Sequence, residues 1–590
     1  MDSSRLEPFL VNSCNNNHLA KGGFRALPFI IVTDGMEKVV TYGLGASMIL
    51  YLTREYGLEN ADGAQVMFIW TAAINFTPVL AAFLADSYVG RYWMIGFGSI
   101  TSILGNVLLW LTAAIPEARP QPCVDPDSTD SCRLRATTPQ LLFLYAALGL
   151  ISIGSGSMRS SCMAFGADQM MGNTKRSTSR VLESIFSWYY ISTSISILLA
   201  ITVIVYIQDS AGWSAGFGVC VVLMVLSALS FFLASPFYVK PAAKASLVTE
   251  LAQVVVAAWT KRSIKLQPPQ STTLAYHHHH HSNAAIMNSE PTENLRFLNK
   301  ACIIQHPEQD LTQEGKPTNP WRLCTVEQVE DLKSVIRVIP IWSAGMLMSV
   351  TACQQSIQLL QLATMDRHIT PEIEIPAGSF SIFLMLTLLI WVPFYDRVII
   401  PLASTLRGRP ISLPLKKRLG LGILLSSVSM AALGLVESIR RARALDEGLS
   451  NDPNGIVDMS AMWFLLYYVP FGVAEAFNYI GQNEFYYSEL PKSMASISTT
   501  LYQMGLSVSN LVASLVLSMV DHATRGGGDG GEEGRSWVGS NINKGHYDYY
   551  YWVLACLCVG NFVYYVACSK GYGPCKGEVI MEELDGGENQ

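Results

Sequence analysis

The chain has 590 residues, of which 50% are apolar and only 15% are charged, and its formal net charge at pH 7 is −6. Soluble domains carry about a quarter of charged residues. With a mean hydropathy of +0.29, this composition excludes an ordinary multidomain soluble protein.

The hydropathy pattern divides the chain into roughly twelve apolar stretches that are long enough to span a bilayer. A long polar segment, from Lys240 to Leu332, separates the first six stretches from the last six. Two sets of six spans are typical of secondary transporters, which bind substrate between the two bundles near the membrane midplane. We therefore predict an all-α membrane protein. The stretches are centred near 28–51, 64–86, 92–115, 140–166, 184–208, 213–236, 334–360, 377–401, 418–438, 460–481, 494–520 and 548–567.

These stretches define five parts of the chain: an N-terminal segment (1–27), an N-terminal bundle (28–236), a linker (237–333), a C-terminal bundle (334–567) and a tail (568–590). The N-terminal segment has no apolar core followed by a small-residue cleavage site, so we expect no cleaved signal peptide. A histidine run, from His277 to His281, lies in the Ser/Pro/Thr-rich linker. We interpret it as low-complexity sequence, and we expect no metal site.

The first stretch contains three charges, Asp34, Glu37 and Lys38, in the sequence TDGMEKVVTYG. On a helix, Asp34 faces the other two at i+3 and i+4. Two carboxylates held so close cannot both stay ionised cheaply, which favours binding of a proton. The alternative interpretation is a neutralised triad that only holds neighbouring helices together.

The fourth stretch contains GSGSMRSSCMAFGADQ, in which Arg159 is the charge that interrupts an otherwise uncharged span. Intramembrane charges mark either a cavity or a helix contact. Ser152, Ser155 and Gly156 precede the arginine by seven, four and three residues, so its face of the helix is small and hydroxylic. Such a face suits a water-filled cleft better than lipid.

The tenth stretch, YYVPFGVAEAFNYIGQNEF, places Glu475 on one face with Asn478, Tyr479 and Gln482. An arginine in one bundle and a glutamate in the other can pair when a cleft closes and separate when substrate or a proton neutralises one of them. The alternative is a permanent ion pair between the bundles.

The seventh stretch supplies uncharged polar groups after the sequence VIPIW. They are candidates either for hydrogen bonds to a polar ligand or for contacts between helices. These groups are Thr351, Gln354, Gln355 and Gln358.

The basic residues of the short loops favour both termini on the inner side, although they do not all agree. The inner side receives Arg91, Lys175, Arg176, Arg180, Arg407, Arg409, Lys416, Lys417 and Arg418, and the outer side receives Arg133, Arg135, Arg440, Arg441 and Arg443.

This orientation places Cys123 and Cys132 in an outer loop, where a disulfide can persist. The other ten cysteines lie mostly in apolar spans and are interpreted as small core residues.

The junction of the second and third stretches, ADSYVGRY, resembles the loop signature of the major facilitator superfamily. In such a loop a carboxylate and an arginine, here Asp86 and Arg91, latch two helices at the inner gate. Many further motifs together resemble the plant nitrate and peptide transporter family, the plant branch of the proton-coupled oligopeptide transporters. These motifs are KGGFRALPFI, DGMEK, ILYLTREYG, GSGSMRSSCMAFGADQ, FSWYYIS, GWSAGFG, LATMDRHI, IPAGSFSIF, YDRVIIPLA and IGQNEFYYSELPKSMASISTTLY.

The resemblance implies the major facilitator fold, with twelve transmembrane helices and with both termini and the linker in the cytoplasm. The ExxER or ExxEK motif that the family links to proton coupling falls on Asp34, Glu37 and Lys38. The basic residue of the fourth helix falls on Arg159, and the glutamate of the tenth helix falls on Glu475. We predict that Arg159 pairs with Glu475 or with the acids of the first helix. Because arginine stays charged, the titrating partner is expected to be a carboxylate.

Three positions depart from the family pattern. Asp34 replaces the first glutamate and is one methylene shorter, which we expect to weaken its contact with the basic partner, and Ala81 replaces a common glycine of the loop signature, which we expect to be tolerated. Ala352 stands where nitrate-binding relatives have a histidine. An alanine side chain cannot donate a hydrogen bond to an anion, so nitrate would have to be held by other groups.

The sequence therefore predicts a proton-coupled symporter for a small, anionic solute such as nitrate, working by alternating access. Its substrate site is expected to include Arg159, Glu475, Gln354, Gln358 and Ala352. Alternatives are transport of a plant hormone, another organic carboxylate whose apolar part would suit Ala352 and Met348, or small peptides, and a solute sensor that does not transport.

An enzyme is not expected, because the chain shows no metal-ligand spacing, no nucleophile with its base and no phosphate-binding glycine loop. We expect no cofactor. The expected partners are the solute, protons and the lipid bilayer, with a regulatory kinase acting on the linker as a further candidate and with no nucleic acid. The expected location is the plasma membrane.

Overall fold

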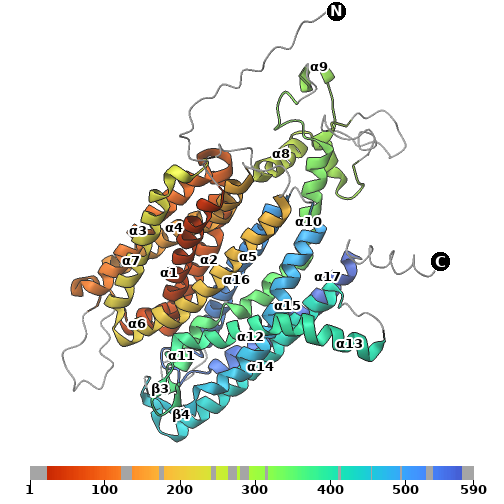
Figure 1. Ribbon diagram of the computed structural model, residues 1–590. Helices are drawn as coiled ribbons and strands as arrows, with labels where there is room; N and C mark the ends of the chain where they lie inside the picture. Colours follow the sequence, from red (N-terminus) through yellow and green to blue (C-terminus); the bar gives the residue numbers. More distant parts are fainter. Residues whose placement is uncertain are drawn as a thin grey trace, which may run out of the picture.

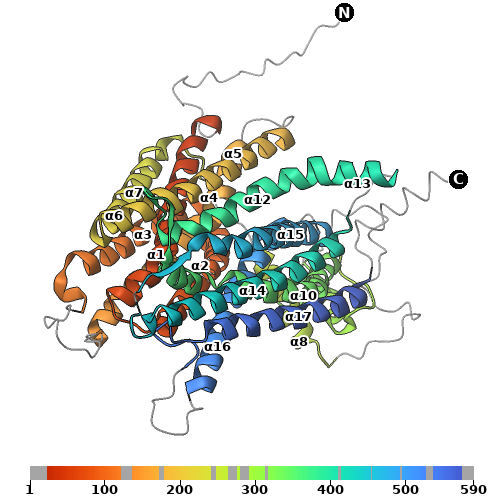
Figure 2. The same cartoon turned by 90° about the horizontal axis from the view of Figure 1, so that it is seen from below.

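The computed structural model describes residues 23–120, 136–171, 178–240, 247–263, 276–278, 291–312, 317–408, 413–453, 455–491, 494–525 and 536–573. Two helical bundles lie side by side, and a smaller helical unit projects from one end (Figures 1 and 2). We call this the linker end. The opposite end, where the short strands lie, is called the hairpin end (Figure 1).

The N-terminal bundle contains the first six spans. Its second helix continues through a π-helical turn, Ala85–Val89, and its fifth span is made of two helices joined by another such turn, Ala200–Ile204. The helices are α1 (Leu27–Arg54), α2 (Asn60–Leu84), α3 (Arg91–Ala114), α4 (Thr138–Met171), α5 (Thr178–Leu199), α6 (Val205–Ser210) and α7 (Trp213–Leu233).

The C-terminal bundle contains the last six spans. They are formed by α10 (Val326–Ala352) with α11 (Gln355–Leu362), α12 (Ile382–Phe394) with α13 (Ile400–Arg407), α14 (Leu415–Asp446), α15 (Leu465–Glu489), α16 (Ala495–Arg525) and α17 (Tyr547–Tyr572). At the hairpin end, β1 (Met365–Asp366) pairs in parallel with β4 (Val457–Ser460), and β2 (His368–Thr370) pairs antiparallel with β3 (Ile373–Glu374).

The number and order of spans confirm the predicted fold class within the described residues. Ten helical segments are long and apolar enough to cross a membrane. The helices α1 and α15 are more polar, yet their 28 and 25 residues also suffice to span a bilayer. The six spans before the linker and the six after it are thus the two predicted bundles.

Small residues bring α4 close to its neighbours. A Cβ atom on Gly154 would lie 2.5 Å from the backbone nitrogen of Ser102 on α3, and one on Gly156 would lie 2.6 Å from the Cβ of Thr77 on α2. Only glycine therefore permits these contacts. The GSGS sequence fixes the part of α4 that carries Arg159.

Polar contacts join the start of α2 to α16 and to the segment before α17 at the hairpin end. The Asn60 amide donates to Ser540 O at 2.9 Å, and the Gln65 amide donates to Ser518 Oγ at 2.9 Å. Arg525 Nη2 lies 3.1 Å from Glu59 Oε2. The bundles are therefore held together at the hairpin end.

The linker contributes an ordered unit next to the start of α10. Helix α8 (Leu247–Thr260), a 3₁₀ helix (Arg296–Cys302) and the first turns of α10 share one apolar core, and α9 (Pro307–Asp310) lies beyond them. A capping box between Thr325 and Gln328 starts α10 at Val326, inside the segment assigned to the linker from sequence. His277 forms backbone hydrogen bonds to Cys302 and Val326, and His279–His281 lie outside the described residues.

Three arginines assigned to an outer loop from the charge pattern lie instead within α14, which runs to Asp446. Arg440 is fully buried, and its guanidinium donates to both carboxylate oxygens of Glu437 at 2.7 and 2.8 Å. It also donates to Asn543 Oδ1 at 2.7 Å. A buried, paired arginine contributes to helix packing. Arg440 therefore should not be counted with the loop charges from which membrane orientation is inferred.

Candidate functional site

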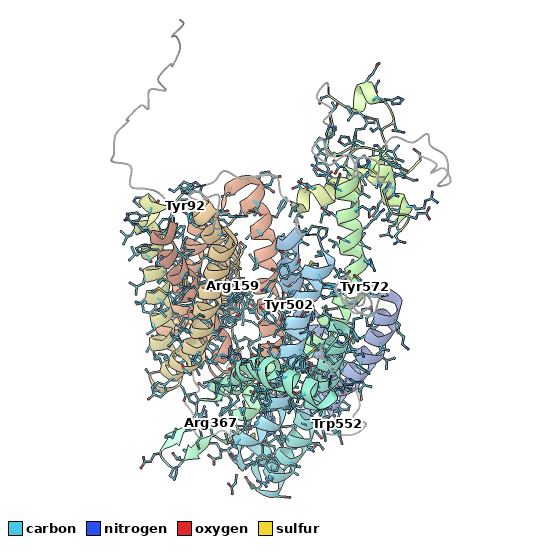
Figure 3. The ribbon with its side chains drawn as sticks, turned by 45° about the vertical axis from the view of Figure 1, so that its right-hand side comes forward. Tyr92, Arg159, Arg367, Tyr502, Trp552 and Tyr572 are labelled. Carbon is cyan, nitrogen blue, oxygen red and sulfur yellow. The ribbon has the colours of Figure 1, made fainter. Side chains whose placement is uncertain are left out.

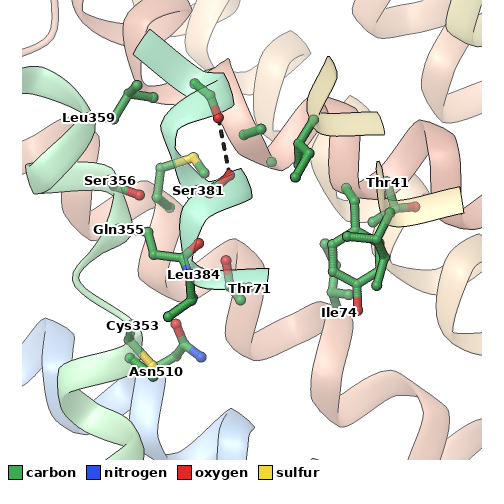
Figure 4. A pocket seen from close by; sticks show the side chains of 18 of the residues that line it. Thr41, Thr71, Ile74, Cys353, Gln355, Ser356, Leu359, Ser381, Leu384 and Asn510 are labelled. Carbon is green, nitrogen blue, oxygen red and sulfur yellow. Dashed lines mark hydrogen bonds between the residues drawn. The ribbon is translucent and has the colours of Figure 1, made fainter. Parts of the chain in front are cut away.

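A cavity of about 330 Å³ lies between the two bundles. Its N-terminal wall comes from α1, α2, α4 and α5, and its C-terminal wall comes from α10, α11, α12, α15 and α16. Figure 4 shows polar side chains, such as Thr71, Gln355 and Asn510, beside apolar ones, such as Ile74 and Leu384. The cavity can therefore accommodate a solute that has both a polar and an apolar part.

Arg159 and Glu37 form an ion pair at the N-terminal wall. Arg159 Nε lies 3.3 Å from both carboxylate oxygens of Glu37, whose side chain is fully buried. Thr41 donates to Glu37 Oε1 at 2.8 Å, and Ser155 donates to the same oxygen. Three donors thus converge on one buried carboxylate.

The guanidinium of Arg159 faces the cavity beyond this pair. Its centre lies 5.1 Å from the ring centroid of Tyr42, within the range of a cation–π contact. Its Nη2 atom is buried and has no hydrogen-bond partner. Arginine therefore retains donor capacity for an anion at this wall.

Asp34 and Lys38 form a second ion pair on α1, with Lys38 Nζ 2.7 Å from Asp34 Oδ2. Both residues are anchored to α5, because the Tyr189 hydroxyl donates to Asp34 Oδ1 at 2.8 Å and Lys38 Nζ donates to Thr193 Oγ1 at 2.6 Å. The two acids that the i, i+3 spacing was expected to hold together as a pair therefore bind different partners. Each carboxylate has its own cation, and Glu37 is the one paired with Arg159.

Glu475 lies on the opposite wall of the same cavity. The Tyr502 hydroxyl donates to its Oε1 atom at 3.3 Å, and its Oε2 atom is buried without a hydrogen-bond partner. Figure 3 places Arg159 and Tyr502 near the boundary between the bundles. Of the two predicted partners of Arg159, this structure pairs it with a first-helix acid, Glu37, and not with Glu475.

Of the three candidate glutamines in the seventh span, the structure places Gln355 in the cavity, and not Gln354 or Gln358, which were expected at the substrate site. Helix α10 ends at Ala352 and α11 begins at Gln355, so the break between them changes which side chains face inward. Gln355, with Ser356 and Ala352, lines the cavity, as Figure 4 shows for the first two.

Gln354 and Gln358 lie behind this wall. The amide nitrogen of Gln354 donates to Val350 O at 3.0 Å, and its oxygen accepts from the Tyr550 hydroxyl at 3.0 Å. Gln358 is 1% exposed and is not among the described residues that line the cavity. In this geometry neither side chain is positioned to contact a substrate in the cavity.

The predicted latch residues lie together at the junction of α2 and α3. Gly90 has a φ of 85°, which glycine adopts without strain, and the turn brings Asp86 Oδ1 within 3.0 Å of Arg91 Nε. Arg91 Nη1 also lies 2.8 Å from Asp168 Oδ2 of α4. The latch therefore joins three helices. The sequence reasoning missed Asp168, although it is the acid of the GADQ motif that ends the quoted stretch of α4.

Two further predictions concern a disulfide and the absence of a metal site. Cys123 and Cys132 lie outside the described residues. Within the described residues, no group of three or more His, Cys, Asp or Glu side chains could hold a metal ion.

A family model described as the POT family matches residues 92–533. The chain belongs to the POT family. Similar relatives from Arabidopsis thaliana are Protein NRT1/PTR FAMILY 1.2, which is 48% identical over 97% of this chain and 93% of the relative, and Protein NRT1/PTR FAMILY 1.1, which is 48% identical over 96% and 94%. These relatives confirm the resemblance to the plant nitrate and peptide transporter family. Its members are transporters, so the protein is a membrane transporter and not an enzyme.

Solved structures of POT family members share the fold. One, an auto-inhibited POT family peptide transporter, superposes with a TM-score of 0.63 at 18% identity over 92% of this chain and 97% of that chain. Another, the POT family transporter PepTSo, superposes with a TM-score of 0.65 at 15% identity over 93% and 98%. The two-bundle architecture of the major facilitator superfamily is thereby confirmed.

Proposed function

We propose that this POT family transporter is a proton-coupled symporter that carries a small anionic solute by alternating access. The observation that carries the proposal is the Glu37–Arg159 ion pair on the wall of a cavity shared by both bundles. A carboxylate and an arginine in one cavity couple two ligands, because whatever neutralises one side chain frees the other.

The coupling follows from the cost of an unpaired buried charge. When a proton binds the Glu37 carboxylate, the resulting carboxylic acid no longer neutralises Arg159. The guanidinium then pairs with the negative group of the solute. Loading with the proton and the anion together, or with neither, keeps the charges of Glu37 and Arg159 balanced, whereas loading with one alone leaves an unbalanced charge at this pair.

Glu475 and the Asp34–Lys38 pair complete the proposed machinery. Glu475 presents an unpartnered carboxylate oxygen on the other bundle, so it is the group that can meet Arg159 when the cavity closes. Asp34 and Lys38 connect α1 to α5 and are proposed as a second site that responds to protonation.

Nitrate is a small anion that fits this chemistry, and an organic carboxylate or a small peptide is the alternative. A cavity of about 330 Å³ with Ile74, Leu359 and Leu384 among its walls has room for an apolar body beside the charged group. Gln355 and Ser356 offer amide and hydroxyl groups for a polar solute.

We place the linker end and both chain termini in the cytoplasm and the protein in the plasma membrane. The hairpin end, where polar contacts hold the bundles together, then faces outward. In this orientation Asp86, Arg91 and Asp168 form a gating latch at the inner face. The linker, proposed as residues 237–333, is then accessible to a regulatory kinase.

The proposal is tested by uptake in oocytes that express the full chain. A panel of nitrate, a dipeptide and several organic carboxylates is offered at acidic and at neutral external pH, and proton influx is recorded with solute uptake. We expect at least one anion to be accumulated faster at acidic pH, with proton entry. Saturable binding without uptake would identify a sensor, and uptake independent of proton influx would identify a uniporter.

A further inference from the structure

Helix α8 is apolar on two faces. Its inner face, including Val254, Ala257 and Ala258, packs in the core that the linker shares with the first turns of α10. Its outer face exposes Val255, Val256 and Trp259, with 52, 42 and 69% of their surface accessible. A helix that is apolar on both sides either is enclosed by protein or contacts a membrane.

The outer face carries the side chains of a membrane interface. The guanidinium of Arg262 lies 5.0 Å from the ring centroid of Trp259. The same type of contact recurs at the linker end of the bundles, where Lys240 Nζ lies 3.7 Å from the Tyr92 ring and the Arg337 guanidinium lies 4.7 Å from the Tyr572 ring. Aromatic rings paired with basic groups at the ends of spanning helices occupy the headgroup level of a bilayer.

The position of α8 brings it to that level. Leu251 of α8 packs against the same core as Val335 of α10, close to Arg337. Ile339 of α10, two residues further, is 45% exposed on the surface of a spanning helix. Figure 1 shows α8 beside α10 at the linker end. The outer face of α8 is thus continuous with the surface that the protein presents to lipid.

We infer that the outer face of α8 docks into the headgroup–acyl boundary of the leaflet at the linker end. A bilayer fits better than a second copy of the chain, because three adjacent side chains fall far short of the roughly 800 Å² per partner that a stable protein interface buries. A helix with tryptophan and valine on one face and an arginine at its end binds the membrane plane without crossing it. This docking holds the start of α10 against the membrane surface and does not depend on the identity of the solute.

The inference is tested by photo-crosslinking in the full chain. The crosslinking amino acid p-benzoyl-phenylalanine replaces Val256, and the purified protein is irradiated in nanodiscs of phosphatidylcholine and phosphatidylglycerol. The matched control carries the same group at Glu308, an exposed position on α9, which Figure 1 shows at the far tip of the linker unit. Mass spectrometry of the peptides identifies the molecule that each position captures.

We expect phospholipid adducts at position 256 on the order of tenfold above those at position 308, because an interfacial helix inserts its apolar face among the lipids. When Trp259→Glu is combined with the crosslinker at position 256, the adducts there should fall severalfold, because the tryptophan anchor is lost. Trp259 is exposed, so this change should leave the fold intact. Equal lipid capture at the two positions would overturn the inference. Capture of a second chain, or of residues 264–290 of the same chain, would overturn it as well, because another occupant would then cover the face.

Discussion

Arg159 of α4 lies 3.3 Å from Glu37 of α1, and this ion pair borders a cavity whose opposite wall carries Glu475. Two carboxylates on separate bundles are thus available to one permanent cation, although only Glu37 holds it in this structure. An exchange of partners is the simplest way in which protonation and solute binding can control closure of the cavity.

Replacement of Arg159 tests whether this cation is central. Arg159→Ala should abolish uptake, because it removes the cationic group of the cavity and leaves the buried Glu37 carboxylate without its partner. Arg159→Lys keeps the charge but loses the planar fork, so it should retain a fraction of the activity. Uptake is compared at equal surface expression, and an alanine variant that transports at the wild-type rate would make Arg159 a structural residue.

Ala352 is the position that should control nitrate affinity. It lines the cavity and offers no donor. Adding one hydrogen bond to a charged group contributes on the order of 1.5–3 kcal/mol, and each 1.4 kcal/mol changes affinity about tenfold. Ala352→His should therefore strengthen nitrate uptake at least about tenfold and weaken uptake of any bulky solute. The two Michaelis constants are measured side by side, and an unchanged preference would remove this residue from the specificity argument.

Arg440 should be a stability residue and not a transport residue. Its guanidinium is fully buried against Glu437, Thr364 and Asn543, so Arg440→Ala leaves an unpaired carboxylate inside the C-terminal bundle. Loss of one member of a buried ion pair costs about 3–5 kcal/mol. The thermal midpoint of the purified protein should fall clearly. The control Arg443→Ala, at an exposed position on the same helix, should leave the midpoint nearly unchanged, and equal midpoints for the two variants would contradict this assignment.

The Arg525–Glu59 pair should help to keep the hairpin end closed but should contribute little to the free energy of unfolding. Both side chains are about half exposed, at 50 and 42%, and exposed ion pairs contribute only about 0–1 kcal/mol. Arg525→Ala should shift the population toward separation of α2 and α16. The distance between spin labels at these helix ends reports that shift, and an unchanged distance distribution would show that the contacts of Asn60 and Gln65 hold this end alone.

The sequence predicted the spans and bundles well, because each span repeats the same requirement for about 20 apolar residues. It also located the charges of the site, since an intramembrane charge is rare enough to be noticed singly. The sequence did not show which glutamine of the seventh span lines the cavity, because spacing left both ligand contact and helix contact open for each of them. The helix breaks between Ala352 and Gln355, and the structure places Gln355 in the cavity.

Contacts between residues that are distant in sequence could not be predicted either. Tyr502 donates to Glu475 from the next helix, and Asp168 completes the Asp86–Arg91 latch from α4. No regular spacing in the sequence indicates either contact, because tertiary packing alone brings these residues together. Local spacing placed Asp34 beside both Glu37 and Lys38 on α1, but only packing against α4 brought Arg159 to Glu37 as a separate cation.

The most direct test of proton coupling compares two assays of Glu37→Gln in proteoliposomes, with a solute that the wild-type protein transports. Accumulation driven by a pH gradient requires the proton site, whereas exchange of labelled for unlabelled solute, without a gradient, requires only solute binding and alternating access. Glutamine retains an oxygen that can accept from Arg159 and cannot titrate. We predict that Glu37→Gln loses gradient-driven accumulation and keeps exchange. Accumulation at the wild-type level under the same pH gradient would show that the proton binds elsewhere and would contradict the role given to the Glu37–Arg159 pair.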